Sequence, residues 1–212
     1  MQGFYEIPQY AFESQEHMLR GGAEADRAVA VGALEYVPDD MVEEVMTDAI
    51  VHPWLVVDQG GGKWRACQDY SGGINLLNDA PPFELDSVWE LPNILGPNSF
   101  MAKYDIRDGF WHARVDPACR RRLLVRHPTN GRLMWASRLP FGYVDSPRLF
   151  CMLTKGIQAE FQKRYAGRGM HLLVYVDDFL CVGEDEATTR EACRLLEGLF
   201  AEFGLEWAPH KR

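Results

Sequence analysis

The stretch His171-Leu-Leu-Val-Tyr-Val-Asp177-Asp178-Phe-Leu-Cys-Val-Gly183 contains two short apolar runs joined by a pair of aspartates. This pattern predicts two buried strands, over residues 171–176 and 179–183, that meet at the two carboxylates. Adjacent carboxylates repel each other and are costly to bury, so at a hairpin tip they reach solvent, pair with cations or hold a metal ion. On this segment alone, ordinary turn chemistry is an equally open interpretation.

A third carboxylate, Asp105, ends another strand-like run over residues 100–105, within Lys103-Tyr-Asp105-Ile-Arg-Asp-Gly-Phe110. Two-metal phosphoryl transfer needs carboxylates from separate strand ends, because Mg²⁺ prefers hard oxygen ligands and two ions ~4 Å apart bridge the attacking and leaving oxygens. One aspartate after a strand would mean little. Asp105 becomes significant because Asp177 and Asp178 lie at the predicted hairpin.

Charge is distributed unevenly along the 212-residue chain, whose net charge is −9. Residues 103–155 hold eleven basic and four acidic residues, so this segment carries +7 and the remainder −16. A cationic segment permits nucleic-acid binding without demonstrating it, because a charge run is usually a solvated face.

Cellular context follows from what the sequence lacks. Its apolar stretches are far shorter than the ~20 residues that span a bilayer, so no membrane contact is expected. Five scattered cysteines without a CxxC pair argue against disulfides or a zinc site. An intracellular location, in cytoplasm or nucleus, is therefore predicted.

Other segments give coarser predictions. Residues 1–27 are acidic and short of β-branched residues, which predicts a weakly ordered lead-in. The run Gly60-Gly61-Gly62 reads as a hairpin turn rather than a phosphate cradle, because the Walker lysine is missing. Periodicity predicts helices over residues 28–50 (broken at Pro38), 84–95, 146–165 and 186–203, and hairpins pairing 52–58 with 63–69 and 121–125 with 133–138.

Four motifs occur in the order found in the reverse transcriptases of retroviruses and retrotransposons, which the chain resembles over nearly all of residues 28–212. Lys63-Trp-Arg65-Ala-Cys-Gln-Asp-Tyr70, followed by Ile74-Asn75, resembles the fingers signature, and residues 103–115 resemble motif A. Residues 139–150, Leu-Pro-Phe-Gly-Tyr-Val-Asp-Ser-Pro-Arg-Leu-Phe, resemble motif B. Tyr175-Val-Asp-Asp178 is the YxDD form of motif C.

The resemblance implies an α+β fold: the fingers and palm of a right-handed polymerase, with a small antiparallel palm sheet backed by helices. Fingers would comprise about residues 28–92 and 114–145, and palm about 93–113 and 146–212. The thumb is absent from this segment, so other domains of a parent polyprotein, thumb and RNase H, are expected partners.

The resemblance also implies roles at the acidic site. Asp105 and Asp177 would hold two Mg²⁺ ions, or Mn²⁺, with the Ile106 carbonyl as a further ligand and Asp178 as an accessory carboxylate. Phe110 matches the steric gate, an aromatic ring that leaves no room for a 2′-hydroxyl and so implies dNTP substrates. Without the neighbouring motifs, Phe110 would read as a core residue.

Further roles concern substrate and template. Lys63 and Arg65 would bind the triphosphate, a task suited to paired guanidinium donors, and Lys211 (or Arg212) would protonate pyrophosphate. The motif B residues Phe141 and Gly142 would pack against the nascent base pair. Nucleic-acid contacts are expected from Arg120, Arg121, Arg122 and Tyr175.

The expected function is RNA-directed DNA polymerisation: a reverse transcriptase from a retroelement that extends a primer on an RNA or DNA template. Two departures from the family, Asp58-Gln59-Gly60 and Ser71-Gly72-Gly73, suggest fewer phosphate contacts in the fingers. Two alternatives stay open: an RNA-dependent RNA polymerase, and a domesticated or truncated copy that binds nucleic acid without catalysis.

Overall fold

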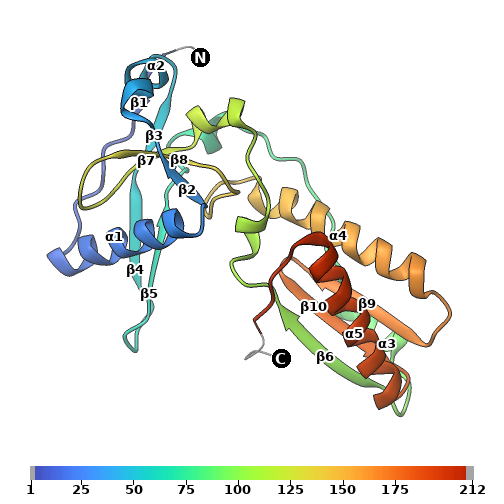
Figure 1. The fold of residues 1–212 in the computed structure, drawn as a ribbon. Helices are drawn as coiled ribbons and strands as arrows, with labels where there is room; N and C mark the ends of the chain where they lie inside the picture. Colours follow the sequence, from blue (N-terminus) through green and yellow to red (C-terminus); the bar gives the residue numbers. More distant parts are fainter. Residues whose placement is uncertain (1–2, 209–212) are drawn as a thin grey trace. The chain divides into compact units, whose positions relative to one another are not determined.

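A computed structural model describes residues 3–208 and divides the chain into two compact units (Figure 1). Unit 1 comprises Met1–Ala80 and Ala113–Ser146, and unit 2 comprises Pro81–His112 and Pro147–Arg212. The first boundary lies earlier than the one predicted near Pro92. Residues that follow Ala80 join unit 2 because Asp86 is bonded to its sheet and to a helix, as described below.

Unit 1 is built on a five-stranded mixed sheet. Strands β1 and β3 and strands β3 and β7 are parallel, whereas β7 with β8 and β8 with β2 are antiparallel. In spatial order the strands are β1 (Tyr5–Glu6), β3 (Ile50–His52), β7 (Leu124–Arg126), β8 (Leu133–Ala136) and β2 (Leu34–Tyr36). The pair β7–β8 confirms the second predicted hairpin.

A separate hairpin in unit 1 joins β4 (Trp54–Asp58) to β5 (Trp64–Gln68), with Trp54 opposite Gln68 and Asp58 opposite Trp64. The three glycines of its turn, Gly60, Gly61 and Gly62, all have positive φ, at 80°, 62° and 76°. Side chains with a Cβ rarely adopt this backbone conformation. The glycine run is therefore explained by turn geometry, as predicted.

The prediction of a weakly ordered lead-in is wrong from Gln15 onward, because α1 (Gln15–Ala30) is a regular helix capped by Ser14. The helix packs through small residues: Gly21 and Gly22 approach the side chains of Pro128 and Thr129 so closely that a Cβ on Gly22 would meet Thr129 Cγ2 at 2.6 Å. The buried face of α1 consists of glycine and alanine, small residues that do not mark a core face in the sequence, and the prediction therefore missed the helix.

The apolar pattern over residues 28–50 forms more than the two helical pieces expected. After α1 come β2, a 3-10 turn η1 (Asp39–Met41) and the short helix α2 (Val42–Met46). Val45 of α2 packs with Val37, Val51 and Leu124 in the core of unit 1. Unit 1 also contains the 3-10 turns η2 (Ile74–Leu77) and η5 (Pro117–Arg122).

Unit 2 centres on a three-stranded antiparallel sheet in the order β6 (Phe100–Asp105), β10 (Asp178–Gly183), β9 (Met170–Tyr175). Side chains alternate between its faces. On one face, Tyr104 and Phe179 are fully buried and make edge-to-face contacts with Phe200 of α5 (Glu186–Phe203). The other face carries Asp105 and Asp178, so the sheet itself separates the core from the candidate site.

Helices and 3-10 turns complete unit 2. Helix α5 has the predicted bounds and ends at Gly204, whose φ of 70° is the left-handed C-cap conformation. Helix α4 (Ser146–Tyr165) also follows the prediction. The helix expected over residues 84–95 starts later, as η3 (Val88–Glu90) and α3 (Leu91–Ile94), because Ser87 forms a capping box with Glu90. A last 3-10 turn, η4 (Gly109–His112), follows β6.

Two further predictions from composition can be compared with the fold. All five cysteines are free in the structure. Within residues 3–208, no helix has the length and apolar character needed to cross a bilayer.

Candidate active site

The aspartate pair lies at a two-residue hairpin turn between β9 and β10, in which Tyr175 pairs with Asp178 and the loop is Val176-Asp177. Val176 has φ of 56°, a left-handed conformation that is unfavourable for a β-branched residue. Such strain costs on the order of 1–3 kcal/mol and persists only where surrounding contacts hold it. The turn thus fixes the direction in which Asp177 leaves the sheet.

Backbone contacts bring Asp105 to the same end of the sheet. Asp105 is the cross-strand partner of Asp178, and the Ile106 N–H donates to the Asp177 carbonyl at 3.0 Å. On its other side Ile106 pairs with Trp207, and the Ala208 N–H donates to the Asp105 carbonyl at 2.9 Å. All three predicted carboxylates therefore come from two adjacent strands and the turn beside them.

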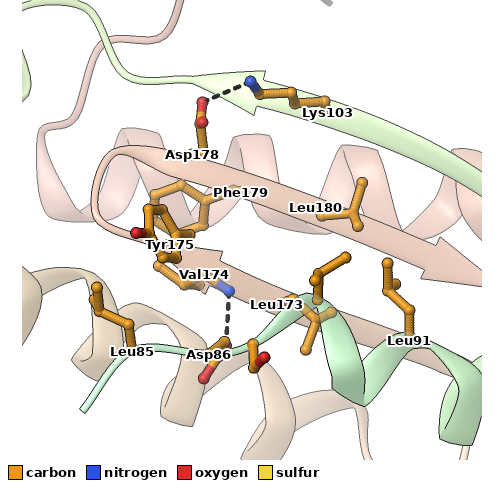
Figure 2. A pocket seen from close by; sticks show the side chains of 12 residues that line it. Leu85, Asp86, Leu91, Lys103, Leu173, Val174, Tyr175, Asp178, Phe179 and Leu180 are labelled. Carbon is orange, nitrogen blue, oxygen red and sulfur yellow. Dashed lines mark hydrogen bonds and ion pairs between the residues drawn. The ribbon is translucent and has the colours of Figure 1, made fainter.

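Lys103 faces these carboxylates from the neighbouring position of β6. Its Nζ lies 3.0 Å from Asp178 Oδ1 (Figure 2), and both side chains are partly exposed. The hydrogen bond to Asp178, with the nearby charges of Asp178, Asp105 and Asp177, raises the pKa of the Lys103 ammonium above its ordinary value. No sequence motif had singled out Lys103 for a role, although strand alternation places it on the face of Asp105.

The donor set at this site fits a divalent cation in its chemistry, because carboxylates are the hard oxygen ligands that Mg²⁺ takes. The arrangement of these side chains fits a metal ion less well than their chemistry does. Among residues 3–208, no three or more His, Cys, Asp or Glu side chains converge closely enough to hold a metal ion together. One of the three carboxylates, that of Asp178, is engaged by Lys103 instead.

Phe110 lies next to this site on η4. Its ring is partly buried and contacts Phe150 edge-to-face, with centroids 5.6 Å apart. Gly109, beside it, is buried against the hairpin: an added Cβ would meet both Asp177 Cβ and the Phe150 ring at 3.2 Å. The missing side chain of Gly109 thus lets the segment that carries Phe110 approach the turn that carries Asp177.

A partly buried acidic residue outside every motif, Asp86, holds the edge strand of the hairpin. Its carboxylate accepts from the Val174 N–H at 2.7 Å, from Gln158 Nε2 at 2.5 Å and from Lys155 Nζ (Figure 2 shows the Val174 bond). Burial raises the pKa of Asp86, but these hydrogen bonds and the Lys155 charge outweigh burial and leave the pKa below its ordinary value. An aspartate before a serine cap gives no sequence signal for such a role.

We expect Asp86→Asn to lower the free energy of unfolding by about 1–3 kcal/mol at pH 7. The asparagine amide places an N–H donor among the donors of Val174, Gln158 and Lys155, which the carboxylate accepts. A lowered carboxyl pKa stabilises the fold above the unfolded-state value of about 3.9, and this contribution is lost as the pH falls through the folded-state pKa. Urea titrations at pH 7 and below pH 4 should show the mutant's deficit shrinking in acid.

The matched control is Asp79, an exposed aspartate that precedes Asp86 in the chain. Asp79→Asn should unfold as the wild type does at both pH values. Equal stability of Asp86→Asn and wild type at pH 7 would contradict the proposed stabilisation of the edge strand by the Asp86 carboxylate.

The fingers-type candidates Lys63 and Arg65 lie in unit 1, on the β4–β5 hairpin, and both are exposed. Trp64 between them is anchored to α1: the His17 ring contacts it at 4.6 Å, and the Arg20 guanidinium lies 5.8 Å from its centroid. The helix that the sequence missed therefore supports the hairpin that carries the two cations.

The motif B loop is also held within unit 1. Gly142 has φ of 90°, and a Cβ there would lie 2.3 Å from the Gln68 carbonyl oxygen, so only glycine fits. Asn75 brackets the loop, donating to the Gly142 carbonyl and accepting from the Val144 N–H, each at 2.9 Å. Phe141 is 38% exposed.

The three predicted nucleic-acid arginines on η5 differ in their surroundings. Arg120 pairs with Glu35 at 2.9 Å and Arg122 with Asp48 at 2.8 Å, whereas Arg121 is exposed. Tyr175, predicted to contact nucleic acid from unit 2, is 58% exposed. Lys211 and Arg212 lie outside the described residues.

Comparison with known proteins defines the class. The family model described as "Reverse transcriptase (RNA-dependent DNA polymerase)" matches residues 80–212, which is more than half of the chain. The chain therefore belongs to the reverse transcriptase family.

One relative is the Gag-Pro-Pol polyprotein of Mason-Pfizer monkey virus, which is 27% identical over 168 residues. The match covers 75% of this chain but 9% of the polyprotein. The chain thus spans a small part of the length of the curated relative that it matches.

Proposed function

We propose that this chain is the fingers and palm region of an RNA-directed DNA polymerase from a retroelement, with unit 2 as palm and unit 1 as fingers. The observation that carries the proposal is the placement of Asp105, Asp177 and Asp178 at one end of the unit 2 sheet, on a strained hairpin and its neighbouring strand. Membership of the reverse transcriptase family supports the same reading.

The reaction is attack of a primer 3′-hydroxyl oxygen on the α-phosphorus of a dNTP. A P–O bond forms, the bond to pyrophosphate breaks, and the hydroxyl proton is lost. Two bound Mg²⁺ ions would lower the pKa of the hydroxyl and neutralise the triphosphate. In this assignment Asp105 and Asp177 would hold the ions with the Ile106 carbonyl, and Lys211 would protonate pyrophosphate.

Substrate positioning is assigned to residues of both units. Phe110 sits beside the carboxylate end of the sheet, where it would lie beneath the incoming sugar. The exposed cations Lys63 and Arg65 would bind the triphosphate, and Phe141 with the backbone of Gly142 would pack on the nascent base pair. Template contacts fall to Tyr175 and η5, where Arg121 is the exposed member.

Primer extension with the 212-residue chain tests the proposal. We expect a labelled primer annealed to an RNA or DNA template to be extended with Mg²⁺ or Mn²⁺ and dNTPs, but not with rNTPs. Equal extension with rNTPs would instead identify an RNA polymerase. Template binding that weakens steeply with salt, without extension under any of these conditions, would identify a binding protein that has lost catalysis.

A further inference from the structure

The open face of the unit 2 sheet is organised in cross-strand rows. Asp105, Asp178 and Tyr175 form the row nearest the hairpin turn, and Lys103, Leu180 and Leu173 form the next. Like charges directly opposite each other, as Asp105 and Asp178 are, destabilise a strand pair. The Lys103 ammonium, 3.0 Å from Asp178, lies where it offsets that repulsion.

The surroundings of Lys103 restrict where its charge can go. It lines a cavity of about 550 Å³, bordered mainly by apolar side chains that include Leu85, Val88 and Leu180 (Figure 2). An ammonium group is not stable in an apolar cavity, whereas its methylene stem packs there at little cost. The ammonium therefore stays outside the cavity, on its solvent-exposed side, where Nζ contacts Asp178.

The ion pair with Lys103 makes the Asp178 carboxylate a weaker ligand for a cation. A carboxylate bound to an ammonium has fewer lone pairs for a cation, and the ammonium repels any cation nearby.

We propose that Lys103 is a positioning residue of the metal site: it holds Asp178 out of the ligand set and supplies a fixed positive charge that weakens cation binding at Asp105 and Asp177. This inference rests on the proposed two-metal function. It assigns Asp178 to the lysine rather than to the ions, and it makes Lys103 a determinant of metal affinity.

Mn²⁺ binding to the 212-residue chain without nucleotide, followed by the electron paramagnetic resonance signal of free Mn²⁺, tests the assignment. Lys103→Met should lower the Kd about three- to tenfold, the effect of one removed charge a few ångströms away in a partly solvated site. Asp178→Asn should raise the Kd by a similar factor, because it leaves the lysine charge unopposed. The double variant should return close to the wild-type Kd.

Two controls isolate the charge. Lys103→Arg keeps it and should keep the wild-type Kd. Lys163→Met removes a lysine that is 79% exposed at the far end of α4, and should also leave the Kd unchanged. Circular dichroism of each variant verifies that the comparison is made between folded proteins.

The outcomes separate this inference from the proposed function. An unchanged Kd for Mn²⁺ in Lys103→Met would show that the Lys103–Asp178 contact is a surface ion pair without effect on the metal. If the double variant binds Mn²⁺ as weakly as Asp178→Asn does, Asp178 is a direct ligand. Either result overturns the inference. If Asp105→Asn and Asp177→Asn bind Mn²⁺ as the wild type does, the metal site itself fails, and with it the proposed function.

Discussion

Asp177→Asn is expected to abolish nucleotide addition while leaving the fold intact. The substitution keeps the shape of the side chain but removes a charge from the proposed metal site, and a loss of at least about a thousandfold, or ~4 kcal/mol of transition-state stabilisation, should follow. The backbone carbonyl of Asp177 accepts from the Ile106 N–H, and this hydrogen bond is unchanged in asparagine.

The measurement is primer extension per folded molecule, with unfolding midpoints recorded in parallel. Asp105→Asn should behave alike, whereas Asp178→Asn should retain some activity because its carboxylate is bound to Lys103. Asp79→Asn, exposed and in unit 1, controls for the loss of one negative charge. Extension by folded Asp177→Asn at near wild-type rate would refute the two-metal assignment.

The elements nearest the candidate site were the most predictable from sequence. The hairpin of β9 and β10, the strand β6 and the helix α5 have the predicted bounds to within about two residues. Each has strong apolar periodicity with a clear stop, such as the Gly204 cap. These signals are local, so one sequence is enough to find them.

Features that depend on partners distant in the chain could not be predicted. Helix α1 is stabilised by the close approach of Gly22 to Thr129, and Asp86 acts through Val174 and Lys155. The small residues on the buried face of α1 and the single carboxylate of Asp86 do not stand out in the sequence. Lys103 pairs with Asp178 because of the register of β6 against β10, and no short sequence motif predicts that register.

The count of +7 over residues 103–155 overestimates the local field for the same reason. Arg120, Arg122 and Arg126 are each paired with an acidic residue from another part of unit 1, namely Glu35, Asp48 and Glu6. Charge summed along a segment ignores counter-charges that folding brings to it. Of the arginines on η5, the exposed Arg121 is therefore the sharpest single site for testing template contact.

Substitution of Phe110 by valine or alanine is expected to let the enzyme incorporate ribonucleotides. If the ring lies flat beneath the incoming sugar, a 2′-hydroxyl collides with it, and a smaller side chain leaves space at the cost of weaker dNTP binding. The surroundings leave room for this role, because Phe110 is only partly buried, its ring contacts Phe150 edge-to-face, and the preceding Gly109 lies against Asp177.

Discrimination is the ratio of kcat/KM for a dNTP to that for the matching rNTP. It should fall by orders of magnitude in Phe110→Val, each tenfold step corresponding to ~1.4 kcal/mol of differential transition-state binding. Phe83→Val removes an exposed phenylalanine of the same unit and should leave the ratio unchanged.

Stability measurements separate the steric gate from a packing role. A packing residue would lose unfolding free energy, on the order of 3–5 kcal/mol for a fully buried phenylalanine replaced by alanine, without any change in sugar selection. If Phe110 is instead a partly exposed steric gate, its substitution should cost less unfolding free energy and should remove most of the discrimination between dNTPs and rNTPs. Unchanged discrimination in an active Phe110→Val enzyme would show that the ring only packs against Phe150, and the assignment of dNTPs as substrates would lose its main support.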